Sequence, residues 1–180
     1  MTAIPTGTFA IDTSHSEIGF VVRHSGIAKV RGRFTDFVGS FTVAENFADS
    51  SAQVTIQSGS VHTGNEQRDA HLRSADFWNA EENPEWTFTS TSVEGSGEEF
   101  VLHGDLTVNG VTRPVALEAE FNGAIGAEGE ETLGFTIETE ISRKDFGLTF
   151  NVVLDGGNLL VGDKVKVAIE VEAVRELVTA

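Results

Sequence analysis

Three histidines are the side chains of this 180-residue chain best suited to acid–base catalysis or metal binding. The fold can bring His15, His24 and His71 together at one end of a domain, beside Asp69 and Asp76. A metal site needs about three ligands in contact, and a general base needs a partner that orients it. No HxxxH or HxH spacing supports either site. Asp69 and His71 lie two residues apart, so they would not face each other on a helix.

Three roles therefore stay open for these histidines. The favoured one is structural: His15 and His71 satisfy buried amides in a turn and at a helix end. The second is contact with the head group or terminal units of a bound molecule, and the third is catalysis or metal binding. His62 and His103 are expected on the surface. The chain has no cysteine and no P-loop, dinucleotide or G-x-S-x-G motif, so we predict no catalytic residue, metal ligand or cofactor.

A helix over about residues 65–75 must position His71. Thr63 and Glu66 have the spacing of a capping box, and Asn83-Pro84 forces a turn after the segment. A helix of this length is marginal by itself, so we expect it to pack on a sheet and to plug or rim one end of a barrel. The apolar residues that predict the helix recur at intervals of three and four: Ala70, Leu72, Ala75, Phe77 and Trp78.

Charged residues near this helix are expected to anchor it. Ion pairs among Arg68, Asp69, Arg73 and Asp76 are more plausible than a catalytic pair. Farther along the chain, Arg143-Lys144-Asp145 before Phe146-Gly147 predicts a tight turn that drops Phe146 onto the barrel end.

Strand and turn patterns fill the rest of the chain, which reads as one domain over residues 8–176. Asn109-Gly110 between two alternating runs is a strong hairpin signal. The alternation slips by one between Phe34 and Phe37, which indicates a bulge or bend in a long strand. We predict an all-β fold, an extended eight-stranded antiparallel barrel with one helix covering an end, in preference to a two-sheet sandwich. The expected strands cover residues 9–11, 18–22, 29–43, 53–61, 86–91, 100–108, 115–121, 133–141 and 165–171.

Composition limits the partners. A net charge of −16 argues against nucleic acid and against an anionic membrane surface. The charge is uneven: residues 1–75 carry six basic and seven acidic side chains, and residues 76–180 carry six and twenty-one. The sequence contains no apolar run of 18 residues, which a membrane span would need, and the start of the chain has no signal-peptide pattern. We therefore expect a cytoplasmic protein without stable membrane insertion.

Short motifs in a fixed order resemble the YceI-like family of bacterial lipid-binding proteins. The match is collinear from about residue 8 to residue 176, and although each fragment is weak, their order is specific. The matching fragments are IDTSHS (11–16), His24 with Gly26, VRGRF (30–34), RDAHLRSADF (68–77), TF (87–88), GDLT (104–107) with GVTRPV (110–115), RKDFG (143–147) and VGD (161–163).

This resemblance implies a lipocalin-like barrel with a long apolar lumen. It also implies an isoprenoid lipid as ligand, either a polyisoprenoid or an isoprenoid quinone, held for carriage, storage or sequestration. Inward residues of the alternating strands, with residues at the barrel end, would then contact the lipid. These predicted ligand-binding residues are His15, Phe20, Val22, His24, Phe34, Phe41, Ile56, His71, Leu72, Phe77, Phe88, Leu106, Leu117, Phe135, Ile137, Phe146, Val167 and Ile169.

Two other outcomes stay open at this stage. The same inward residues can interdigitate into a solid core, which would suit a stress-related structural protein. Alternatively, His15, His24 and His71 can form an enzyme site at the barrel end for a small hydrophobic substrate. Family relatives are often dimeric and many are exported, which leaves a homodimer open.

Overall fold

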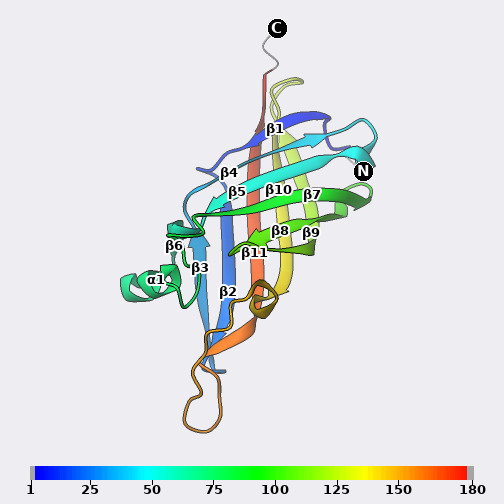
Figure 1. Ribbon diagram of the computed structural model, residues 1–180. Helices are drawn as coiled ribbons and strands as arrows, with labels where there is room; N and C mark the ends of the chain where they lie inside the picture. Colours follow the sequence, from blue (N-terminus) through cyan, green and yellow to red (C-terminus); the bar gives the residue numbers. More distant parts are fainter. Residues whose placement is uncertain (1–2, 178–180) are drawn as a thin grey trace.

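The computed structural model describes residues 3–177, which form a closed antiparallel β-barrel (Figure 1). Eight strands make the ring, in the order β1-β4-β5-β7-β8-β9-β10-β11, and β11 pairs back to β1. The strands are β1 (Gly7–Ile11), β2 (Glu17–His24), β3 (Ala28–Phe34), β4 (Phe37–Val43), β5 (Ser51–Gln57), β6 (Val61–His62), β7 (Glu85–Gly95), β8 (Glu99–Val108), β9 (Val111–Ile125), β10 (Thr132–Ser142) and β11 (Val161–Arg175).

Bent strands extend the barrel beyond the closed ring. β1 and β2 pair one after the other along the same edge of β11, and β3 and β4 pair with β2 and β1 in turn. The parity slip between Phe34 and Phe37 marks the break between β3 and β4, where Thr35 and Asp36 bond to Ser60 instead of a neighbouring strand. The segment expected as one strand over 29–43 is thus two strands. Similarly, the run over 53–61 is β5, a 3-10 turn (Ser58–Ser60) and β6.

The predicted helix is present but shorter than expected. Helix α1 (Glu66–Arg73) ends at Ser74, whose backbone N–H and hydroxyl both donate to the carbonyl of His71. Ala70 and Ala75 are exposed, while Phe77 and Trp78 are buried in the turn after the helix. The apolar residues that predicted one helix therefore belong partly to a short helix and partly to the turn after it. A turn can bury two neighbouring residues such as Phe77 and Trp78, which a helix would point in different directions.

The capping-box prediction is wrong. Asn65 is the N-cap, and its side chain accepts from the backbone N–H of Arg68 at 3.0 Å. Thr63 instead donates to the buried carboxylate of Asp69 through both its backbone N–H and its hydroxyl. Asn at the N-cap supplies the same type of acceptor as Thr, so the first helical turn is capped two residues after the position that the box required.

The expected ion pairs around α1 are also replaced by other contacts. The guanidinium of Arg68 donates to the hydroxyl and carbonyl oxygens of Thr63, and Arg73 donates to the carbonyl of Gly59. Asp76 accepts from His71 at 2.8 Å. These charged groups anchor the helix as expected, but they do so mainly through backbone and hydroxyl partners, which are closer to them than the opposite charges.

Two turns follow the sequence prediction. Asn109 and Gly110 join β8 to β9 with φ angles of 51° and 73°, the left-handed pair that a type I′ hairpin requires. The 3-10 turn η3 (Arg143–Phe146) ends at Gly147, also left-handed, and buries Phe146 to 2% exposure. Between η3 and β11 the chain leaves the barrel as a loop over residues 148–160, at the end of the molecule opposite the C-terminus (Figure 1).

Candidate apolar binding cavity

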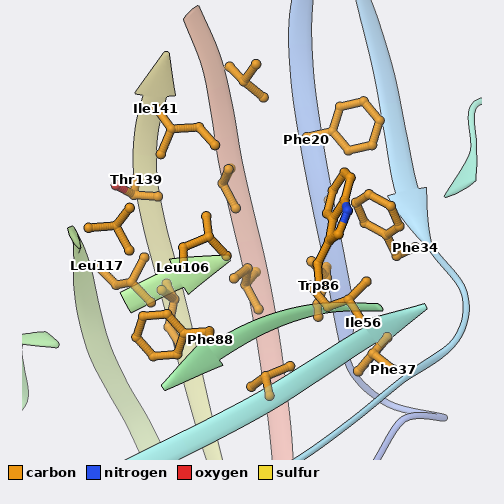
Figure 2. A pocket seen from close by; sticks show the side chains of 18 of the residues that line it. Phe20, Phe34, Phe37, Ile56, Trp86, Phe88, Leu106, Leu117, Thr139 and Ile141 are labelled. Carbon is orange, nitrogen blue, oxygen red and sulfur yellow. The ribbon is translucent and has the colours of Figure 1, made fainter. Parts of the chain in front are cut away.

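A cavity of about 640 Å³ lies inside the barrel (Figure 2). The inward residues of the alternating strands line it: Phe20, Phe34 and Trp86 on one side, and Phe88, Leu106 and Leu117 on the other. On β11 the lining runs from Val161 to Val171, which is about 30 Å of strand. The space is therefore long, and it extends along most of the barrel.

Two glycines help to keep the lumen open. A Cβ atom at Gly32 would collide with the ring of Phe20, and one at Gly104 would collide with the ring of Phe88. Each ring therefore lies against the wall of the barrel, on the backbone of the neighbouring strand, instead of projecting across the centre. A side chain at either position would push an aromatic ring into the lumen.

One end of the cavity, the sealed end, is closed mainly by strand residues, with Ile4 and Phe47 packed against them. Phe9, Leu133 and Ala173 are fully buried there, together with Val43, Phe121 and Phe135. Phe41 stacks on Phe9 at 5.4 Å and meets the edge of Phe135 at 5.4 Å. Arg175 lies over the outer face of Phe9 and pairs with Glu131, which lowers the pKa of that carboxyl to about 2. This end offers a ligand an apolar floor.

The other end, the mouth, is built from α1, the turn after it and the loop before β11. Trp78 and Trp86 pack at 5.1 Å, and Phe150 of the loop lies 5.0 Å from Phe77. Seven lining residues are exposed, and five of these lie here: Arg23 and His24 at the end of β2, and Asn65, Gln67 and His71 in or beside α1. The lumen therefore reaches solvent beside the helix, which rims this opening.

Arg143 holds the loop of the mouth in place. It is 4% exposed, and its guanidinium donates to the carbonyls of Leu148, Phe150 and Gly162 at 2.7–2.9 Å. Burial lowers the pKa of this group, while Asp163 at 3.6 Å raises it. Arg143 is part of the cavity lining, but its N–H groups already donate to backbone carbonyls. Its role there is therefore structural.

The three histidines do not come together. His15 lies beside Glu172, near the sealed end, whereas His24 pairs with Val161 at the mouth, about 35 Å away along β11. His71 is on α1, exposed, with its Nε2 on Asp76. The arrangement needed for an enzyme site of all three is therefore absent. The favoured structural role also needs correction, because His15 binds the half-buried carboxylate of Asp12 and His71 binds the exposed carboxylate of Asp76, and neither binds a buried amide.

His15 belongs to a small charged group outside the cavity. Its Nδ1 donates to Asp12 at 2.9 Å and lies 4.0 Å from Glu172. The hydrogen bond to Asp12 raises the pKa of His15, and the bonds from His15 and Ser14 lower the pKa of Asp12 to about 2. The ligand atoms of Asp12, His15 and Glu172 lie within 4.8 Å of one another. The hydrogen bonds within this group account for its geometry as a brace at the β1–β2 bend.

Every predicted site residue except His15 lines the cavity. Those that the structure places on the lining are Phe20, Val22, His24, Phe34, Phe41, Ile56, His71, Leu72, Phe77, Phe88, Leu106, Leu117, Phe135, Ile137, Phe146, Val167 and Ile169. That they contact a lipid stays a prediction.

Sequence comparison places the chain in a known group. The YceI-like domain family matches residues 9–173. The chain belongs to the YceI-like family. It is 46% identical over 137 residues to Protein YceI of Escherichia coli O157:H7, covering 74% of this chain and 71% of that protein. It is 45% identical over 142 residues to UPF0312 protein plu2095 of Photorhabdus laumondii, covering 76% of this chain and 72% of that protein.

Solved structures share the barrel of this YceI-like protein. The Campylobacter jejuni YceI protein superposes with a TM-score of 0.72 at 33% identity, covering 83% of this chain and 87% of that one. BcnA of Burkholderia cenocepacia superposes with a TM-score of 0.79 at 22% identity, covering 90% and 98%. A polyisoprenoid binding domain from Saccharophagus degradans superposes with a TM-score of 0.70 at 16% identity, covering 96% and 100%. At these lower identities, the last two show the fold alone.

Several wall residues of this YceI-like barrel escaped the sequence prediction. Phe37, Trp86 and Phe100 all lie on inward positions of alternating strands, so the alternation that found Phe34, Phe88 and Leu106 also pointed to them. The aromatic residues of the irregular segments, Trp78 and Phe150, follow no period of two, so only the folded chain identifies them.

No helix in the described part of the chain is both long and apolar enough to cross a membrane.

Chemically, the wall suits a hydrocarbon and offers little to a reacting group. The indole N–H groups of Trp78 and Trp86 are buried without an acceptor, and the guanidinium groups of Arg68 and Arg143 at the rim are bound to backbone or hydroxyl oxygens. Apart from these two unpaired indole N–H groups, the wall would hold a guest by apolar contact along its length.

Proposed function

We propose that this YceI-like protein binds an isoprenoid lipid, of polyisoprenoid or isoprenoid quinone type, in the barrel lumen, and that it carries, stores or sequesters the lipid there. The observation that carries the proposal is the shape of the cavity, an apolar channel of about 640 Å³ that follows β11 from Val161 to Val171. A long hydrocarbon chain matches such a channel, whereas a compact polar substrate would leave most of the wall uncovered.

The energetics favour recognition by the tail. Each enclosed CH₂ group contributes roughly 0.8 kcal/mol, so a five-carbon prenyl unit contributes about 3–4 kcal/mol. A few such units exceed the roughly 4–15 kcal/mol lost when two molecules associate. The head group can then rest at the mouth among polar side chains such as Gln67 and His71 and add little to the affinity.

The family and one structural neighbour support the same class of ligand. The chain belongs to the YceI-like family, and the Saccharophagus degradans domain with the same fold is described as a polyisoprenoid binding domain. These comparisons point to a binding protein and leave the particular lipid open. Cytoplasmic location and dimerisation stay predictions, which cell fractionation and analytical ultracentrifugation test.

Mass spectrometry of an organic extract tests the proposal. The purified protein is denatured, extracted and examined for isoprenoid lipids, and the emptied protein is then offered a long-chain isoprenoid quinone. We expect a co-purified isoprenoid or saturable uptake of the quinone. Protein that yields no lipid and takes up no quinone would contradict the proposal.

Variants at Leu106 separate binding from folding. Leu106→Trp fills the lumen with apolar bulk, so we expect a stable barrel that takes up much less quinone. Leu106→Glu places a carboxylate in the channel and should lose uptake or folding. Ala116→Glu, on the outer face of β9, is the matched control and should behave like the natural protein. Normal uptake by Leu106→Trp would show that the guest does not occupy this part of the lumen.

A further inference from the structure

Exposed apolar side chains gather at the tip of the molecule beside the mouth. Eight large hydrophobic side chains of the described residues are exposed, and four of them lie on two neighbouring turns: Ile27 (82% exposed), Val152 (43%), Val153 (71%) and Leu159 (42%). We call these two turns the mouth tip; they are residues 25–27 between β2 and β3, and residues 151–160 of the loop. A group of this kind beside a cavity is typical of an interaction surface.

Hydrogen bonds give the mouth tip a defined shape. Val153 and Leu159 form a β-bridge, and the N–H of Leu160 donates to the carbonyl of Val152 at 2.9 Å. The two turns are joined because the N–H of Ser25 donates to the carbonyl of Leu160, also at 2.9 Å. The apolar side chains therefore project from a braced hairpin, on the segment that extends farthest from the C-terminal end of the barrel (Figure 1).

The charge around the mouth tip is opposite to that of the rest of the protein. Residues 23–31 and 148–160 carry three basic side chains and one acidic side chain, a net charge of +2. Because the whole chain carries −16, the remaining residues carry −18. Lys29 and Arg31 lie on the outer face of β3, two and four residues after Ile27, and both are exposed.

The sealed end provides the contrast within the same molecule. Ile125, Val174 and Leu177 are exposed there, by 73%, 43% and 73%. However, residues 123–131 and 172–177 carry five acidic side chains and one basic side chain. Apolar exposure is thus found at both ends, and only at the mouth tip does it come with positive charge.

We propose that the mouth tip docks onto the surface of a lipid bilayer that carries anionic head groups. Apolar side chains that enter the interface, with basic residues behind them, are the combination by which peripheral proteins bind such surfaces. Phe150, Leu160 and His24 belong to the tip or adjoin it and line the cavity, so docking would bring the mouth against the membrane. The use of this contact for lipid exchange rests on the proposed function, whereas the docking itself does not.

The net charge of −16 does not oppose this orientation. From Val161 to Arg175, β11 spans about 45 Å. Electrostatic interactions are screened over about 10 Å at moderate ionic strength, so a membrane at the tip interacts little with the acidic sealed end. Approach by the sealed end, in contrast, would be repelled.

Vesicle flotation with matched variants tests the docking. The full chain is mixed with vesicles of phosphatidylcholine and phosphatidylglycerol, or of phosphatidylcholine alone. We expect flotation with the mixed vesicles, reduced flotation with phosphatidylcholine alone, and weaker binding at high salt. The double variant Ile27→Ser, Val153→Ser should weaken the binding roughly tenfold or more. Its control is Ile125→Ser, Leu177→Ser, which removes apolar side chains of similar exposure from the acidic end and should float like the natural protein.

The possible results separate the two proposals. Ile27 and Val153 do not line the cavity, so the tip variant should keep the lipid content or quinone uptake of the natural protein. If the natural protein holds lipid but does not float, or if both double variants float equally well, the docking proposal is wrong while the proposed function stands. If the protein floats as expected but holds no lipid, the reverse applies. A third result would also overturn the docking proposal: the natural protein dimerises, the tip variant stays monomeric, and neither protein floats. In that case a second copy of the chain covers the tip.

Discussion

The two ends of this barrel are both rich in aromatic residues, but they are built differently. The sealed end is made mainly from strands β1, β4, β9, β10 and β11, and its central side chains Phe9, Leu133 and Ala173 are fully buried. At the mouth, α1, a turn and a loop carry Phe77, Trp78 and Phe150, and the helix buries only Asp69. Paired strands close an end with a continuous hydrogen-bond ladder, whereas loop and helix segments close it with contacts that can open separately.

This difference predicts unequal stability within one domain. Local openings draw on segments with few buried contacts, and strands in a continuous ladder open only with the whole molecule. A barrel that accepts a long guest needs such an inequality, because the wall must hold while the mouth admits the ligand.

The largest effect is expected at the sealed end. Phe9→Ala removes a fully buried ring that stacks on Phe41, so the free energy of unfolding should fall by roughly 3–5 kcal/mol. Phe150→Ala, the counterpart at the mouth, removes a half-buried ring and should cost about 1–2 kcal/mol. Urea denaturation measures both. Equal losses would mean that the mouth is as much a part of the core as the sealed end.

Arg143 differs from the other residues of the mouth, because it is buried and its side chain alone holds much of the loop in place. Arg143→Met leaves the carbonyls of Leu148, Phe150 and Gly162 without their donor, and we expect a loss of about 2–4 kcal/mol. Hydrogen exchange should rise mainly in residues 147–162. Lys144→Met breaks only a half-exposed pair with Asp163 and should change stability by less than about 1 kcal/mol. Exchange that rises evenly around the barrel would contradict a local role.

A smaller effect is expected at the start of α1. Asn65→Ala removes the acceptor for the N–H of Arg68 and should cost about 1 kcal/mol, while Asn65→Asp keeps an acceptor and should be nearly neutral. Thermal unfolding followed by circular dichroism measures the difference. Since α1 rims the mouth, the Ala variant should also release bound quinone faster than the Asp variant.

Acid should weaken the sealed end first, and this is the smallest effect. The pKa of Glu131 is lowered to about 2 by its bond from Arg175, so the pair stabilises the folded state above the ordinary carboxyl pKa. That contribution is lost as the pH falls from about 4.5 to about 2. Glu131→Gln should flatten the pH dependence of the unfolding midpoint in this window, whereas Glu128→Gln, in the same hairpin, should leave it unchanged. Identical profiles for the two variants would show that the Arg175 pair adds nothing.

The sequence alone determined the β-class, the positions of most strands and the face that each strand turns inward. Period-two alternation fixes which side chains share a face, and local turn chemistry at Asn109-Gly110 and at Gly147 fixes where the chain reverses. For this reason almost all of the predicted wall residues line the cavity. The same local rules failed around α1, because Phe77 and Trp78 are buried by a turn whose spacing imitates a helix.

Only the tertiary structure decided whether the inward face encloses a solid core or a channel. Strand tilt and stagger set the width of a barrel, and neither is encoded in the spacing of apolar residues along one strand. Tertiary structure likewise placed His15 and His24 at opposite ends of β11 and joined Ser25 to Leu160 from more than a hundred residues away. Contacts between distant segments depend on how the sheet closes, and that closure belongs to the folded chain as a whole.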